Sequence, residues 1–415
     1  MLSNSQLSAL VDSRQPGRSL PQPFYTDPSV FDRELELIWE RQWLFVGMTA
    51  QIPKSGNWFT VQIGRSSIVV IRDRAKAVRA FYNTCRHRGS RICAGDKGSS
   101  GTLVCPYHKW TYGLDGKLMF AKEMGEDFNM SEFSLRPVHC ETVEGYIFIS
   151  LADEATPFEA FRETISPYIR PHGLDNAKVA YETTIIEKGN WKLVLENNRE
   201  CYHCTGSHPE LLRTISEFDG PTDPRFGGDY AIKCEKDEAR WTTAGLPHKP
   251  IETDEGYRLV RVAMERGLSF TLSGGLACKK LLGTNEDADV GSLRLLRFPN
   301  TWNHVLSDHA VAFRILPLSP TETQVTTWWL VNSEAVEGED YNLDDLTAVW
   351  TATNAQDQKL VEANQQGINS KGYQPGPYSP LVESGVTEFI NWYLDTLRSE
   401  LHAAPNVIPV ACTKA

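Results

Sequence analysis

Apolar and aromatic residues near the start of the chain recur at helical spacing. Between Phe24 and Trp43 acidic residues separate them, and Asp27 and Ser29 stand where capping residues are expected. The apolar positions of this repeat are Phe31, Leu35, Ile38, Trp39 and Trp43. The pattern predicts an amphipathic helix that leads into the first domain.

Short runs of β-branched and aromatic residues follow, and turn residues separate them. They predict strands at Trp58–Ile63, Ser67–Ile71, Val78–Tyr82 and Tyr146–Ser150. The dipeptide Asp115-Gly116 joins two further short runs, which predicts a hairpin at residues 111–120. We therefore expect an N-terminal helical segment at residues 1–44 and a small β domain at residues 45–150.

Helix and strand patterns alternate after Pro157. Strand-like Val179–Ile186 precedes a predicted helix from Asn190 to about His203. Val311–Leu316 and Gln324–Val331 predict paired strands, and helical periodicity returns at residues 342–366 and 384–401. Residues 151–415 are thus expected to form a larger mixed domain, and the fold class is α+β, with a β domain inserted near the start.

Composition and charge narrow the classes of function. The 415 residues are 41% hydrophobic and 23% charged, and the net charge is −11. An acidic chain argues against nucleic acid and against an anionic membrane surface as partners. No stretch approaches the roughly 20 apolar residues that span a bilayer, so a cytoplasmic location is expected. Nine cysteines without an export signal favour metal binding or free thiols over a disulfide framework.

Two half-motifs predict a first metal centre. Cys85-Arg86-His87 and Cys105-Pro106-Tyr107-His108 each supply one thiolate and one imidazole, and residues 88–104 separate them. A structural zinc site is the alternative, but a common zinc finger keeps its two cysteines in one half and its two histidines in the other. The mixed halves favour a Rieske [2Fe–2S] centre, with two cysteines on one iron and two histidines on the other. Cys93, between the halves, is expected to be a packed bystander.

His203 and His208 suggest a second metal centre. A five-residue step rotates about 140° on an ideal helix, so the two rings share a face only if the helix ends or bulges between them. Non-haem iron oxygenases bind Fe(II) with two histidines and one carboxylate. Asp357, on a predicted helix, is the candidate carboxylate and Glu362 is the other; a solvated helix face is the structural alternative for Asp357.

The two motifs together resemble the Rieske non-haem iron oxygenase family, specifically its catalytic α-subunit. The resemblance covers nearly the whole chain and is carried by residues 83–90, 105–108, 190–193, 196–197 and 376–379. It implies a small all-β Rieske domain inserted near the start of a larger catalytic domain of the helix-grip or START-like kind, with an antiparallel sheet and helices. It also implies one [2Fe–2S] cluster and one mononuclear Fe(II) per subunit. No dinucleotide-binding glycine fingerprint is present, so electrons from NADH are expected to arrive through a separate flavin and [2Fe–2S] reductase.

The resemblance also implies roles for individual residues. By motif position the cluster ligands are Cys85, His87, Cys105 and His108, and the iron ligands are His203, His208 and Asp357. In the family the subunits form a homotrimer, and an acidic residue bridges the cluster of one subunit to the iron of its neighbour. Glu200 stands at that position. Most ring-hydroxylating members have aspartate there, and glutamate resembles the branch that acts on quaternary ammonium compounds.

Within that branch the chain most resembles the betaine demethylases, through residues 20–25, 197–204, 364–367 and 376–379. The resemblance implies O2- and NADH-dependent N-demethylation of stachydrine (proline betaine) or glycine betaine, with release of formaldehyde. A quaternary ammonium group cannot donate a hydrogen bond, so aromatic faces are expected to bind it. Tyr202, Trp302 and Trp328 are candidates, and packing in the core is the alternative for each.

Three other functions remain open at this stage. The first is a monooxygenase of carnitine-like or choline-like substrates. The second is a ring-hydroxylating dioxygenase, which would act on an aromatic compound without releasing formaldehyde. The third is an electron carrier or a zinc-stabilised binding protein, which would need only the first motif. Such a protein would not require His203 and His208.

Overall fold

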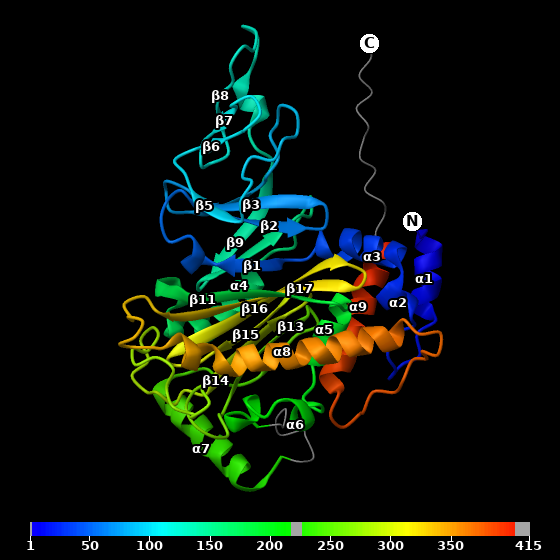
Figure 1. The fold of residues 1–415 in the computed structure, drawn as a ribbon, viewed down its shortest axis with the longest axis vertical. Helices are drawn as coiled ribbons and strands as arrows, with labels where there is room; N and C mark the ends of the chain where they lie inside the picture. Colours follow the sequence, from blue (N-terminus) through cyan, green and yellow to red (C-terminus); the bar gives the residue numbers. More distant parts are fainter. Residues whose placement is uncertain (1, 217–225, 403–415) are drawn as a thin grey trace.

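The protein has two lobes, each built around an antiparallel sheet (Figure 1). The structure is a computed structural model that describes residues 2–216 and 226–402. The upper lobe in Figure 1 holds β1 to β10, and the lower lobe holds the second sheet with α5 to α9 around it. The observed class is α+β, as the sequence predicts.

A seven-stranded sheet and a three-stranded sheet form the upper lobe. The larger sheet has the order β1-β10-β9-β4-β3-β2-β5, and the smaller has the order β6-β7-β8. The strands are β1 (Leu44–Met48), β2 (Asn57–Ile63), β3 (Ser66–Arg72), β4 (Val78–Tyr82), β5 (Lys97–Ser99), β6 (Leu103–Val104), β7 (Thr111–Tyr112), β8 (Leu118–Phe120), β9 (Pro137–Val143) and β10 (Tyr146–Ser150). The four predicted strands and the hairpin around Asp115-Gly116 are confirmed. The loops that carry the two cysteine-histidine half-motifs leave β4 and β6.

The lower lobe contains a second seven-stranded sheet, in which every neighbouring pair is antiparallel. Its order is β11-β17-β16-β15-β14-β13-β12. The strands are β11 (Ala177–Glu187), β12 (Ile251–Glu252), β13 (Tyr257–Val262), β14 (Ser292–Arg297), β15 (Thr301–Val305), β16 (His309–Ser319) and β17 (Glu322–Asn332). The predicted pairing of the last two strands is confirmed, with Ile315 opposite Val325.

Apolar residues on both faces of this sheet are buried. On one face the long helix α8 (Leu343–Ile368) runs across the strands (Figure 1), and Val349 and Trp350 of α8 pack in a core with Phe313. The other face packs against β1, β10 and α4 (Glu159–Ile169) through a second core. Because both faces are covered, β16 and β17 are almost continuously apolar or buried rather than alternating.

The remaining helices lie beside this sheet or below it. They are α1 (Asn4–Asp12), α2 (Pro23–Thr26), α3 (Pro28–Glu34), the π-helical turn η1 (Leu35–Trp39), α5 (Trp191–Asn198), α6 (Cys204–Ser207), α7 (Gly228–Ala244) and α9 (Ser384–His402). Short 3-10 turns are η2 (Thr49–Gln51), η3 (Met130–Phe133), η4 (Arg170–His172), η5 (Leu174–Asn176) and η6 (Leu211–Arg213). No described helix has both the length and the apolar character needed to cross a membrane.

Two predicted helices differ from the observed elements. The helix predicted between Phe24 and Trp43 is divided into α2, α3 and η1, because Pro28 begins a new helix and Asp27 caps it with a 2.7 Å bond from the Ser29 amide. The helix predicted from Asn190 to about His203 ends at Asn198. The Glu200 carboxylate accepts hydrogen bonds from two backbone amides ahead of it, Tyr202 and His203, and these bonds compete with continuation of the helix.

A buried ion pair joins the first helices of the chain to α5. Lys192 Nζ lies 2.6 Å from Glu34 Oε1, and both side chains are almost fully inaccessible. Trp191 donates to the same carboxylate at 2.9 Å, and the Tyr393 hydroxyl of α9 also donates to it. The network therefore connects α3, α5 and α9, which are far apart in the sequence.

We expect Glu34→Ala to destabilise the fold by about 3–5 kcal/mol, because it leaves the Lys192 ammonium buried without its counter-ion. The measurement is urea denaturation followed by tryptophan fluorescence. Glu36→Ala is the matched control: Glu36 is about half exposed and pairs with Arg33, and its loss should cost at most about 1 kcal/mol because water can replace the exposed carboxylate. Equal effects of the two substitutions would contradict this account of the network.

Candidate metal centres

Two loops of similar conformation form the first centre at the tip of the upper lobe. In the first loop the Gly89 amide donates to Cys85 O at 2.9 Å, and Gly89 has the positive φ of +78° that this turn requires. In the second loop the Lys109 amide donates to Cys105 O at 3.1 Å, and Lys109 has a φ of +61°. Each loop therefore turns back on itself directly after its cysteine.

The four predicted cluster residues come together between these loops. The two cysteines are buried, whereas His108 is exposed and His87 is partly exposed. The Nδ1 atoms of His87 and His108 are 3.1 Å apart. Trp110 stacks on His87 with ring centroids 4.9 Å apart, and Tyr107 stacks on His108 at 3.8 Å. Two buried thiols below two converging imidazole nitrogens fit the ligand set of a Rieske cluster.

Tyr112 is a residue of this centre that sequence reasoning missed. Its hydroxyl lies 3.3 Å from Cys85 Sγ and 3.1 Å from the Arg86 amide, which donates to it. The hydroxyl hydrogen is therefore available to the cysteine sulfur. Burial raises the pKa of the Cys85 thiol, and the hydrogen bond with Tyr112 opposes that effect by favouring the thiolate. Tyr112 carries no spacing signal, because only the fold brings β7 beside the first loop.

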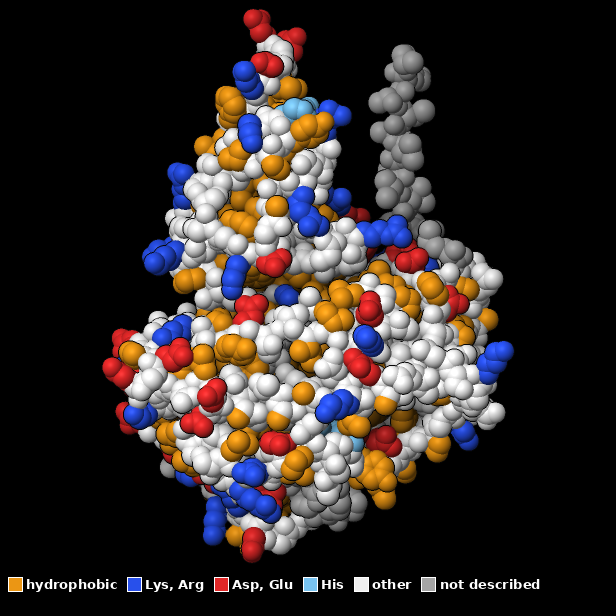
Figure 2. Space-filling model, viewed as in Figure 1, with side chains coloured by type: hydrophobic (Ala, Val, Ile, Leu, Met, Phe, Trp, Pro, Cys, Tyr) orange, Lys and Arg blue, Asp and Glu red, His pale blue; other side chains and the backbone are white. Residues whose placement is uncertain are grey.

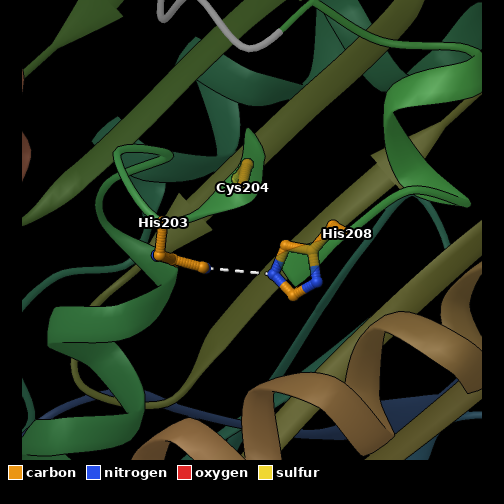
Figure 3. A group of neighbouring side chains, drawn as sticks. All are labelled: His203, Cys204 and His208. Atoms are coloured by element: carbon orange, nitrogen blue, oxygen red, sulfur yellow. Dashed lines mark hydrogen bonds between the residues drawn. The ribbon is translucent and has the colours of Figure 1, made fainter. Parts of the chain in front are cut away.

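The second centre lies around α6. His203 precedes this single turn and His208 follows it, and Figure 3 shows the two side chains pointing toward one another. Their Nε2 atoms are 3.0 Å apart. Asp357 reaches them from α8, with Oδ1 at 3.4 Å from His203 Nε2 and 3.0 Å from His208 Nε2. The structure thus brings together the three residues that the sequence suggested.

The donor atoms of these three residues fit a metal ion. Asp357 Oδ1 is buried and accepts no hydrogen bond of ordinary geometry from the residues that the structure describes. Metal–ligand bonds to nitrogen and oxygen are about 2.1 Å long, so two ligands at a right angle lie about 3 Å apart. The observed separations match a two-histidine, one-carboxylate facial set. Glu362, the other candidate, lies away from this set and accepts bonds from the Lys188 amide and Gln358.

Neighbouring side chains hold the two imidazoles in orientation. Glu200 Oε1 lies 2.6 Å from His203 Nδ1, and Gln356 Oε1 lies 2.8 Å from His208 Nδ1. Each acceptor places the proton on Nδ1 and leaves Nε2 free to face the centre. Burial lowers the pKa of His203, but its interactions with Asp357 and Glu200 outweigh this and raise the pKa to about 9. The protein therefore stabilises positive charge at this position.

A cavity of about 350 Å³ adjoins the second centre. His203, His208 and Asp357 lie in its wall. Its aromatic lining includes Tyr230, Trp241, Trp302, His304 and Trp350. Trp302 is the one sequence candidate for substrate binding that lines it. Tyr202 is outside the lining and 64% exposed, and Trp328 is 1% exposed and packs against Phe45.

Both parts of the chain match models of known families. Residues 42–133 match the Rieske [2Fe-2S] domain, and residues 174–399 match the ring hydroxylating alpha subunit, catalytic domain. The glycine betaine monooxygenase oxygenase subunit of Chromohalobacter salexigens is 49% identical over 401 residues, which are 96% of this chain and 90% of that protein. The carnitine monooxygenase oxygenase subunit of Escherichia coli is 33% identical over 201 residues, which are 48% of this chain and 54% of that protein.

Solved structures share the fold at lower identity. A quaternary ammonium Rieske monooxygenase in complex with L-carnitine superposes with a TM-score of 0.70 at 22% identity, over 95% of this chain and 99% of that chain. Naphthalene 1,2-dioxygenase from Rhodococcus sp. gives a TM-score of 0.69 at 20% identity, over 96% of this chain and 100% of that chain. Enzymes with different substrates thus share this architecture, so the fold alone does not identify the substrate.

We expect Tyr112→Phe to lower the reduction potential of the cluster. Reduction adds negative charge, and a hydrogen bond to a cysteine sulfur stabilises the more negative state. A tenfold change in a one-electron equilibrium is about 59 mV, and we expect a decrease of roughly this size. The measurement is a potentiometric titration followed by the cluster absorption. Tyr107→Phe is the control, since Tyr107 stacks on His108 and its hydroxyl is not part of this contact; an equal shift in both variants would contradict the proposal.

Gln356→Ala should weaken iron binding about 10- to 100-fold, because His208 then loses the acceptor that orients its ring. The measurement is the iron content of the second centre after equilibration with a graded series of chelator. Gln358→Ala is a matched control on the same helix, since Gln358 bonds to Ile186 O and Glu362 rather than to a histidine. If Gln356→Ala retained iron as firmly as Gln358→Ala, the orienting role would be wrong.

The family matches and the two sites lead to the same conclusion. A zinc-stabilised carrier would need only the first site, and residues 174–399 match a catalytic domain. The high identity extends along 96% of the chain, so it includes both sites. The protein belongs to the ring-hydroxylating α subunits: it is the oxygenase component of a Rieske non-haem iron oxygenase, with a [2Fe–2S] cluster and a mononuclear iron.

Proposed function

We propose that the protein catalyses O2- and NADH-dependent N-demethylation of a betaine, with glycine betaine as the first candidate and stachydrine as the second. The observation that carries this proposal is the 49% identity, over 96% of the chain, to a glycine betaine monooxygenase oxygenase subunit. Hydroxylation of an N-methyl carbon gives an N-hydroxymethyl product, which collapses to formaldehyde and the demethylated amine. O2 supplies the inserted oxygen atom, and its second atom leaves as water with the two electrons from NADH and two protons.

We assign the metal ligands because their side chains come together in two groups. Cys85, Cys105, His87 and His108 hold the [2Fe–2S] cluster, and His203, His208 and Asp357 hold the iron. Three protein ligands on one side leave positions open for O2, and activation of O2 is the chemistry that the bound iron supplies. The protein orients the imidazoles through Glu200 and Gln356.

Electron transfer between the two sites requires a second subunit in this proposal. Figure 1 places β6 to β8 and α6 at opposite ends of the molecule. His108 is exposed and His87 is partly exposed, and a histidine and hydrophobic side chains lie together on the surface near the top of the upper lobe (Figure 2). We propose a homotrimer in which His108 of one subunit approaches Glu200 of the next. Glu200 then bridges the two sites, since one of its oxygens already bonds His203.

The cavity supports a cationic, methylated substrate. Three aromatic residues, Trp302, Trp350 and Tyr230, line the same cavity as the residues of the metal centre. A trimethylammonium group is attracted to such faces and donates no hydrogen bond. Electrons reach the oxygenase from NADH through a separate flavin and [2Fe–2S] reductase, because this chain lacks a dinucleotide-binding fingerprint.

The test is formaldehyde release and NADH consumption by the Fe(II)-reconstituted protein with a reductase. Glycine betaine, stachydrine, carnitine and choline are compared, and we expect near-stoichiometric formaldehyde and NADH with glycine betaine or stachydrine. His203→Ala is the control: it should keep the cluster spectrum and release no formaldehyde, because it lacks an iron ligand. Absence of formaldehyde from every quaternary amine, with cluster and iron both present, would contradict betaine demethylation and favour an aromatic substrate.

A further inference from the structure

A disulfide lies beside the second metal centre. Cys201 and Cys204 are joined, with their Cα atoms 4.9 Å apart, and they enclose Tyr202 and His203 in a C-x-x-C segment. The other six cysteines that the structure describes are free. The sequence predicted that the cysteines would be free thiols or metal ligands. The one disulfide among the described residues differs from this prediction, and it lies at the second metal centre.

The position of Cys204 makes it a latent metal ligand. Its sulfur lies within 4.8 Å of a ring nitrogen of both His203 and His208, and Figure 3 shows the three side chains together. Cys204 is buried, whereas Cys201 is partly exposed, and both residues line the cavity. A sulfur held in a disulfide cannot act as a thiolate ligand. Reduction would return that donor without any change in the rest of the chain.

We propose that the Cys201–Cys204 pair is a redox switch that decides which metal the second centre prefers. With the disulfide formed, the donors are two imidazoles and one carboxylate, a set that suits Fe(II). With the disulfide reduced, the Cys204 side chain rotates about its Cα–Cβ bond and adds a thiolate. A set that includes a thiolate favours zinc, which thiolates and imidazoles bind in tetrahedral sites. The proposal needs the metal centre and does not depend on the substrate.

The reduction is an ordinary thiol–disulfide exchange with a dithiol reductant. One thiolate of the reductant attacks Cys201 Sγ, which is the more accessible sulfur, and the Cys201–Cys204 bond breaks. Cys204 leaves as a thiolate beside the two imidazoles. The second thiol of the reductant then displaces Cys201 from the mixed disulfide. The pair gains two electrons and two protons, and the reductant leaves as its own disulfide; a bound metal ion replaces the proton on Cys204.

The experiment compares metal binding by the oxidised and the reduced full-length protein. The iron of the second centre is removed with a chelator while the cluster spectrum is monitored, and dithiothreitol is removed anaerobically after reduction. Competition with a chelating dye then measures the affinities for Zn²⁺ and Fe²⁺. Reduction should increase the Zn²⁺ affinity at least tenfold relative to Fe²⁺. Co²⁺ should give a sulfur-to-cobalt charge-transfer band in the reduced protein alone, and alkylation with mass spectrometry should find two additional thiols, at Cys201 and Cys204.

Two variants should behave in opposite ways. Cys201→Ser leaves Cys204 permanently free, so it should bind Zn²⁺ tightly and show the cobalt band without reductant. Cys204→Ser removes the donor, so it should show neither under any treatment. Cys140→Ser, which changes a free cysteine in β9, should retain the switch of the unaltered protein.

Three results would overturn the proposal. They are an unchanged ratio of Zn²⁺ to Fe²⁺ affinity on reduction, a cobalt–sulfur band that persists in Cys204→Ser, and two free thiols at Cys201 and Cys204 after oxidising treatment. An intact cluster spectrum and an unchanged far-ultraviolet circular dichroism spectrum in each variant show that both lobes have folded. No betaine turnover is measured, so these outcomes are independent of the proposed substrate.

Discussion

The site depends above all on the meeting of one carboxylate with two imidazoles that enter from a different part of the chain. Asp357 Oδ1 lies 3.0 Å from His208 Nε2 and 3.4 Å from His203 Nε2, in a buried position with little water to screen the charges. Such an arrangement of acceptor atoms is costly unless a cation occupies it or the histidines are protonated. The rest of the lower lobe can be understood as the structure that holds these three groups in place.

Two features of the lower lobe achieve this. The sheet supports α8, which carries Asp357 and also Gln356, so that one helix supplies both a carboxylate and the acceptor that orients His208. The segment after α5 supplies the histidines, and α5 is itself held by the buried contact of Lys192 with Glu34. The end of α5 at Asn198 is essential, because a continued helix would turn the two rings to different faces. Glu200 contributes to this end through its bonds to the following amides.

The first centre is organised by local structure instead. Each cysteine begins a tight turn, and the two turns are carried by short strands of the upper lobe. The thiols are buried, whereas His108 is exposed and His87 is partly exposed, so an electron acceptor can approach the histidine side. In Figure 1 that side is far from α6 along the same chain, which explains why the proposed reaction involves more than one subunit. The Cys201–Cys204 disulfide lies at the receiving end of this path, where the proposed switch would act.

The sequence by itself determined the parts of this protein that depend on near neighbours along the chain. The hairpin at Asp115-Gly116, the strands of the upper lobe and the grouping of Cys85 with His87 all follow from short spacings and turn chemistry. Only the tertiary structure decided that Asp357 rather than Glu362 is the carboxylate of the second centre. It also brought the Tyr112 hydroxyl to Cys85 and the Gln356 side chain to His208. Finally, it placed Trp302 but not Trp328 in the lining of the cavity. These features depend on how distant segments pack, and that packing has no periodicity or spacing in the sequence to reveal it.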